Sequence, residues 1–162
     1  MRARVLRRAL SSEAGMTFVF DRPLFLRHRE VTSGLRDSDY YDYLRSEVAN
    51  RVVDRLDDIT RKFPRALDLG CHRGHIFRAL VENEGLGHIE TLVQSDISAE
   101  AVRAASELSQ SSDRIKTSFL VVDEENEVLE EKQFDLVLSS LYLHWVLYAH
   151  GNDTSFHFST GE

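Results

Sequence analysis

The residues that could do chemistry gather in one short stretch, RALDLGCHRGHIFRAL, residues 65–80. A carboxylate, Asp68, stands near the end of a short apolar run, and Gly70 and Gly74 follow it. Glycines at such positions let the main chain turn sharply and let a ligand approach closely. The spacing is neither the G-x-G-x-x-G of dinucleotide sites nor a Walker loop. His72 stands where a nucleotide-binding turn usually has its middle glycine.

Two further acids end later apolar runs, Asp96 in QSDIS and Asp123 in VVDEE. A carboxylate before a glycine turn repels a pyrophosphate and attracts an ammonium or a sulfonium. S-adenosylmethionine carries both cations and no phosphate. Asp96 is placed to accept from ribose hydroxyls, and Asp123 from an adenine amino group. Together the three acids predict an S-adenosylmethionine site, although each alone is a weak signal whose alternative is a helix N-cap or a loop carboxylate.

A metal site is the other chemistry that this stretch suggests, because Cys71, His72 and His75 are close in sequence. Three ligands in one turn, without a distant partner pair, are a poor zinc spacing. We therefore expect no metal here and interpret Cys71 as a small buried residue. Methyl transfer from an activated sulfonium depends on positioning more than on acid–base help, so no catalytic residue is assigned.

The elements that must position these residues alternate between strands and helices. We expect strands at residues 65–69, 88–97, 115–123 and 134–143, each rich in apolar residues. Helices are expected at about 74–84 and 99–109, after a leading helix within 38–59. The acidic segment 124–132 is predicted to be a solvated helix or loop. The fold class is α/β, a Rossmann-like doubly wound parallel sheet that is incomplete, with about four strands.

Composition narrows the function classes. The chain has 162 residues, 42% of them hydrophobic, and a single cysteine, which fits one globular domain without a disulfide framework. The net charge is −7, and the acidic body argues against a nucleic-acid groove. No apolar run reaches the roughly 20 residues that a membrane helix needs. The first twelve residues hold four arginines and no acid, as in a mitochondrial transit segment; a basic tail or a start at Met16 are the alternatives.

The motifs LDLGCHRGHI, QSDIS, VVDEE and FDLVLSSLYLHWV together resemble class I S-adenosylmethionine-dependent methyltransferases. SSLYLHWV is the most specific, and with VFDR at 19–22 it resembles the methyltransferase-like assembly factors of mitochondrial complex I. The resemblance implies S-adenosylmethionine as cofactor and a set of cofactor-binding residues: Asp68, Gly70, Cys71, Gly74, Asp96, Ile97, Asp123, Glu124, Ser139 and Ser140.

The same resemblance implies a protein of the mitochondrial matrix that helps to assemble complex I. Its partners would be a complex I subunit, modified on an arginine by hydroxylation, and assembly intermediates. Peripheral association with the inner membrane is expected, and nucleic acid is not. The alternatives are a generic S-adenosylmethionine-dependent methyltransferase and a catalytically inactive binding or scaffold form.

Three segments are predicted along the chain. Residues 1–36 are interpreted as a basic transit segment and linker, 37–146 as the first part of the cofactor-binding domain, and 147–162 as a divergent tail. The strands and helices that the resemblance implies after Trp145 are absent, so we expect a truncated form that keeps a pocket rather than catalysis. At His72 the family has glycine, and an imidazole there either crowds the ligand or faces solvent.

Overall fold

The computed structural model describes residues 5–7, 20–35, 40, 42–83, 86–125, 127–129 and 133–146. The predicted tail 147–162 lies outside these residues, as do residues 1–4, 8–19 and 36 of the predicted transit segment and linker. No helix of the described part is both long and apolar enough to cross a bilayer. The elements are β1 Val5–Arg7, α1 Arg22–Gly34, α3 Tyr43–Asp54, β2 Phe63–Leu69, α4 His75–Glu82, η1 Leu86–His88, β3 Ile89–Asp96, α5 Ala99–Ser109, β4 Lys116–Val121, β5 Glu127–Leu129, β6 Leu136–Leu138 and η2 Leu143–Trp145.

Four of the strands form one parallel sheet in the order β4-β3-β2-β6. This confirms the predicted α/β class and the parallel sheet. The chain moves outward from β2 to β3 and β4, then returns to add β6 on the other side of β2. The strand order therefore reverses at β2, and open α/β sheets bind ligands beyond the carboxyl ends of the strands at such a point.

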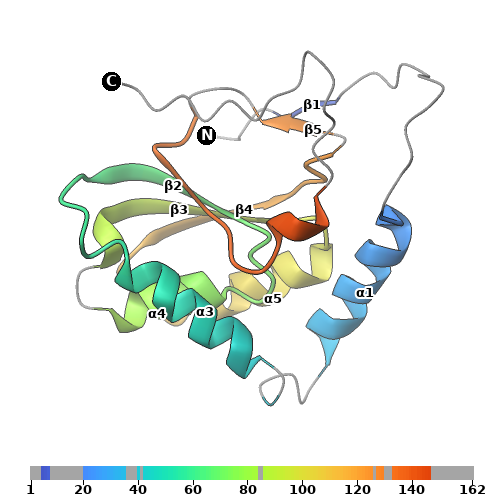
Figure 1. Ribbon diagram of the computed structural model, residues 1–162, viewed down its shortest axis with the longest axis horizontal. Helices are drawn as coiled ribbons and strands as arrows, with labels where there is room; N and C mark the ends of the chain where they lie inside the picture. The colour runs from blue at the N-terminus through green and yellow to red at the C-terminus, as the bar shows by residue number, and fades with distance from the viewer. Residues whose placement is uncertain are drawn as a thin grey trace.

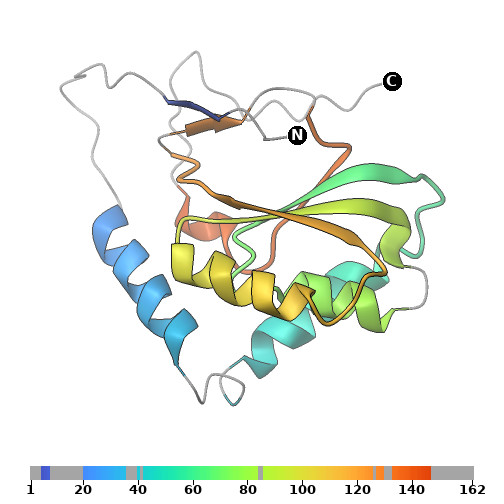
Figure 2. The ribbon, with the colours of Figure 1, turned by 180° about the vertical axis from the view of Figure 1, so that it is seen from behind.

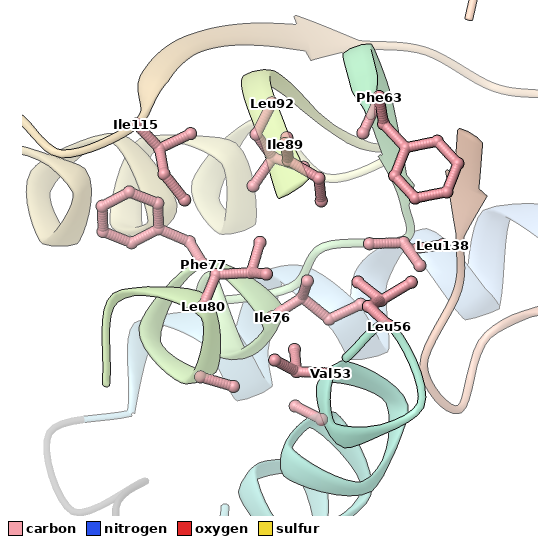
Figure 3. Close-up of a cluster of buried hydrophobic side chains, with 13 residues drawn as sticks. Val53, Leu56, Phe63, Ile76, Phe77, Leu80, Ile89, Leu92, Ile115 and Leu138 are labelled. Atoms are coloured by element: carbon pink, nitrogen blue, oxygen red, sulfur yellow. The ribbon is translucent and has the colours of Figure 1, made fainter. Parts of the chain in front are cut away.

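Helices α3, α4 and α5 cover one face of the sheet, as the two opposite views show (Figures 1 and 2). The main core lies between this face and the helices (Figure 3). A second cluster lies on the opposite face, where Leu67, Leu69 and Val93 pack against Tyr142 and Val146. Because side chains alternate along β2, its apolar residues supply both cores, as expected for a buried parallel strand.

Helix α1 differs from expectation, because the sequence predicts residues 22–34 to be part of a linker. The helix begins at Asp21, whose side chain accepts from the Leu24 N–H, and Pro23 stands in its first turn. Both views place α1 beside α5 (Figures 1 and 2). The leading helix α3, residues 43–54, is shorter than the range within which it is predicted.

Two further segments differ from expectation. The fourth strand is predicted over 134–143, but β6 has three residues, because the chain turns away after Leu138 and Leu141 takes a positive φ of 53°. The acidic segment is predicted as helix or loop, yet Glu127–Leu129 forms β5 and pairs with β1 in a separate antiparallel ribbon. The strands β2, β3 and β4 agree with prediction to within two residues at each end.

Candidate functional site

The glycine turn after β2 has a backbone that requires glycine. Gly70 takes φ +77° and Gly74, the N-cap of α4, takes φ +81°, both in the left-handed region. A Cβ on Gly70 would lie 2.1 Å from Cγ of Tyr142, so no larger residue fits there. The amides of Gly70 and Cys71 both donate to the Ser95 carbonyl at 2.8 Å, which fixes the turn against β3. The sequence thus holds this loop in one shape.

Asp68 is the residue in this loop that needs an explanation. Its side chain is 1% exposed, and neither carboxylate oxygen has a hydrogen-bond partner among the described residues. Burial, together with the nearby charge of Asp96, raises the pKa of Asp68 to about 8. It lines a cavity of about 10 Å³ with Gly70, Cys71 and Ser140. A buried carboxyl without a partner, facing a cavity, is a group that a ligand would satisfy.

In Asp96, by contrast, both carboxylate oxygens accept hydrogen bonds. One oxygen accepts from Arg29 Nε at 2.9 Å and from the Ser98 amide at 3.0 Å. The other accepts from Arg29 Nη2 and from the His72 amide, the latter at 3.0 Å. Arg29 comes from α1 and also lines the cavity beside Asp68. The predicted ribose acid therefore lies at the same edge as Asp68, but an arginine holds it.

The next two acids have a similar arrangement. Arg22 of α1 donates to Asp123 at 2.6 Å and to Glu124 at 2.8 Å. The Tyr142 hydroxyl donates to both Glu124 oxygens, at 2.9 and 2.8 Å. Burial raises the pKa of Glu124 and of Tyr142, so this pair is held in a desolvated pocket. Two arginines of one helix thus pair with the acids at the carboxyl ends of β3 and β4.

The remaining predicted site residues are spread around this edge. Ile97 is buried directly after β3. The Ser139 hydroxyl donates to the Leu69 carbonyl at 3.0 Å, which ties the end of β6 to the end of β2. Ser140 lines the cavity, and its buried hydroxyl has no partner within the described residues. Burial raises the pKa of the Cys71 thiol well above its ordinary value, so it is a neutral buried residue at neutral pH.

Sequence reasoning missed three residues of this site: Arg22, Arg29 and Tyr142. The sequence pattern places the two arginines in a basic segment, yet both are buried and paired with carboxylates. The signal that could have found them is the Asp-Arg-Pro start of α1, since Asp at the N-cap and Pro in the first turn mark a helix. Tyr142 falls in a predicted strand, and its ring instead packs on Gly70.

A parallel sheet that reverses its order beside a glycine turn, with acids at the carboxyl ends of three of its strands, is characteristic of the Rossmann-like ligand-binding folds. Comparison with known proteins narrows this class. Residues 67–155 match the methyltransferase domain family, and the chain belongs to this family.

Relatives and solved structures agree with this assignment. The chain is 42% identical over 139 residues to the arginine-hydroxylase NDUFAF5, mitochondrial, of Danio rerio, covering 86% of this chain and 40% of that protein. For the Homo sapiens protein of the same name the identity is 41% over 128 residues, covering 79% and 34%. The chain therefore spans well under half the length of these relatives.

A solved structure with a similar fold is the N-methyltransferase NodS of Bradyrhizobium japonicum in complex with S-adenosyl-L-homocysteine. It has a TM-score of 0.53 and 18% identity, over 69% of this chain and 54% of that one. At this identity the likeness shows the fold alone. The expected class I methyltransferase type of sheet is thereby confirmed.

Proposed function

We propose that this chain binds S-adenosylmethionine at the glycine turn after β2. The observation that carries the proposal is Asp68, a buried carboxyl that faces a cavity without a hydrogen-bond partner among the described residues. A cationic ligand would bind its ionised form and lower its raised pKa. When bound, S-adenosylmethionine supplies a methyl group on an activated sulfonium. Asp68 and Ser140 would hold its methionine end, and Asp96 its ribose.

The charges of the site support this ligand over a dinucleotide. Asp68 lies two residues before Gly70, and a cation in the turn would stabilise its ionised form, whereas a diphosphate would disfavour ionisation and gain no charge pairing from it. The imidazole of His72, in place of the family glycine, does not project into solvent, because the residue is 4% exposed. Its amide donates to Asp96 and so helps to orient the ribose acid.

The site as described is closed to an adenosyl ligand. The cavity beside Asp68 measures about 10 Å³, whereas ligand pockets measure on the order of 300 Å³ or more. Arg29 holds the two Asp96 oxygens that ribose hydroxyls would use. Binding therefore requires Arg29 to leave Asp96, and the affinity is lowered by the free energy of that ion pair.

We also propose that the chain acts in mitochondria in the assembly of respiratory complex I, through modification of an arginine of a complex I subunit by hydroxylation. Support comes from its identity of about 40% to mitochondrial proteins named arginine-hydroxylase, and from the motif SSLYLHWV. Contacts with assembly intermediates and with the inner membrane surface belong to the same proposal. The chain covers 40% and 34% of these relatives, and the part it covers overlaps the segment that matches the methyltransferase domain.

A second candidate function is a non-catalytic binding module. The observation that favours it is the closure of the site by Arg22 and Arg29, which satisfies Asp96, Asp123 and Glu124 without any ligand. In this form the chain would contact its protein partner with an empty cofactor site.

Titration calorimetry of the full chain with S-adenosylmethionine, S-adenosylhomocysteine and NAD separates these functions. We expect saturable binding of the adenosyl ligands, at least about tenfold weaker in Asp68→Asn, since a charge-assisted contact is lost. The exposed Asp58→Asn is the matched control and should bind as the wild type does. Heat with NAD alone would overturn the cofactor assignment. No heat with any of the three ligands from a folded chain would favour the binding module.

A further inference from the structure

Three metal-ligating side chains converge at the start of α4, apart from the acids described above. Asp42 precedes α3, His72 lies in the glycine turn, and His75 is the first residue of α4. Each offers one ligand atom, these atoms lie within 4.8 Å of one another, and all three residues are buried. The spacing of the two histidines with Cys71 indicates no distant partner, but the fold supplies one in Asp42, about thirty positions earlier.

His75 is oriented as a metal ligand would be. Its Nδ1 lies 3.3 Å from the Ser46 hydroxyl, and its Nε2 lies 3.6 Å from Oδ2 of Asp42. With Nδ1–H donating to Ser46, the lone pair of Nε2 faces Asp42. Metal-bound histidines use their second nitrogen in this way. In a tetrahedral site with bonds of about 2.0 Å, neighbouring ligand atoms are about 3.3 Å apart. The distance of 3.6 Å between His75 and Asp42 is close to this value, and all three ligand atoms lie within 4.8 Å of one another.

An ion pair between His75 and Asp42 alone would explain those two residues, but it leaves His72 unexplained. His72 is 4% exposed, and neither ring nitrogen has a hydrogen-bond partner among the described residues. It also holds a positive φ of 50°, which is unfavourable for a residue other than glycine. A buried imidazole with both nitrogens unsatisfied is destabilising. A metal–nitrogen bond would offset this by giving a partner to one of the two ring nitrogens, neither of which accepts or donates a hydrogen bond within the described part of the chain.

Charged side chains surround the three residues, and two arginines among them are each paired with a carboxylate. Arg45 lies 3.5 Å from Oδ1 of Asp42, which leaves Oδ2 on the side of His75. Arg29 is already paired with Asp96. Asp68 lines the same cavity as the two histidines, but it is not one of the three clustered ligands.

We propose that Asp42, His72 and His75 bind one divalent transition-metal ion, with a fourth position open to the cavity. The cavity of about 10 Å³ that the two histidines line has the size of a single water site, which suits a fourth ligand. Two imidazoles and one carboxylate form a donor set that binds Zn²⁺ in catalytic-type sites and Fe²⁺ in non-haem sites. Hard cations such as Mg²⁺ prefer all-oxygen sites and are not expected here. The proposal does not depend on S-adenosylmethionine.

The test is a metal titration of the chelator-treated full chain. Zn²⁺, anaerobic Fe²⁺ and Mg²⁺ are titrated by calorimetry, and Co²⁺ is followed by its visible absorption. We expect one equivalent of Zn²⁺ or Fe²⁺, no Mg²⁺ binding, and the intense visible bands of four-coordinate Co²⁺ with imidazole ligands. The relative affinity for Zn²⁺ and Fe²⁺ identifies the ion the site prefers.

The informative variant is His72→Gly, because glycine accepts the positive φ and so removes the ligand without backbone strain. We expect it to weaken Zn²⁺ binding at least about 100-fold, and Ser46→Ala to weaken it about tenfold as an orienting partner. His28→Ala, at an exposed histidine of α1, is the control and should bind as the wild type does. Equal affinity in wild type and His72→Gly, or no Zn²⁺ and Fe²⁺ binding by a folded wild type, would overturn the proposal.

Discussion

Replacing Asp68 by asparagine is predicted to stabilise the protein in the absence of ligand. The reason is that the buried carboxyl has a pKa of about 8 in the folded state, against 3.8 as its ordinary value. Between these two pH values the folded state binds a proton that the unfolded state has lost. Stability therefore falls as the pH rises from about 4 to about 8, and an amide that cannot ionise avoids this loss.

The magnitude follows from the same shift. One pKa unit corresponds to about 1.4 kcal/mol, so the raised pKa of Asp68 lowers the free energy of unfolding by up to about 4 kcal/mol at pH 7. Local relaxation around a carboxylate reduces this, and we expect Asp68→Asn to gain about 2 to 4 kcal/mol at pH 7. Below pH 4 the carboxyl is neutral in both states, and the gain should vanish.

Urea unfolding of the wild type and Asp68→Asn at pH 4, 5.5 and 7 measures this gain, with the exposed Asp58→Asn as control. Other titrating groups cancel in the difference between wild type and variant at each pH. A variant that is no more stable than the wild type at pH 7 would refute the reasoning. A gain of the same size at pH 4 and pH 7 would refute it as well, because it would not come from ionisation.

Three further predictions concern the groups around Asp68. Arg29→Ala should lower the free energy of unfolding by about 3 kcal/mol without ligand, because it leaves the buried Asp96 unpaired. S-adenosylmethionine should raise the melting temperature of this variant more than that of the wild type. An equal rise in both proteins would contradict a closing role for Arg29. Gly70→Ala should lower the free energy of unfolding by about 2 kcal/mol or more, because its Cβ would overlap the Tyr142 ring and because φ is +77°. An unchanged midpoint of chemical denaturation would argue against this packing. Tyr142→Phe should lower the free energy of unfolding by about 1 to 3 kcal/mol, because Glu124 loses a buried hydrogen-bond donor. An unchanged free energy of unfolding in urea would show that the hydroxyl is not needed there.

The sheet and the glycine turn could be predicted because their signals are local. Each of the first three parallel strands is an apolar run that ends near an acid, and Gly70 and Gly74 mark the turn. Parallel strands buried on both faces have this continuous apolar pattern. The turn residues then take the left-handed conformation that their sequence allows. Asp68, two residues before the first of these glycines, indicates a cationic ligand only together with Asp96 and Asp123 at the ends of the next two strands.

The closure of the site could not be predicted in this way. Arg29 and Asp96 are 67 residues apart, and an arginine that pairs in the interior has the same sequence pattern as one in a basic tail. Likewise, the apolar run 134–143 has the same composition whether it continues as a strand or turns back after Leu138. The turn is set by tertiary contacts, namely the Ser139 hydroxyl on Leu69 and the Tyr142 ring on Gly70.

The proton balance of ligand binding tests the central claim most directly. If S-adenosylmethionine binds the ionised form of Asp68, a carboxyl with a pKa of about 8 must lose its proton at pH 7, and about one proton is released per ligand bound. Calorimetric titrations in buffers of different ionisation enthalpy measure this number. We predict a release of about one proton at pH 7, falling towards zero at pH 9. Binding without proton release at pH 7 would contradict the role assigned to Asp68.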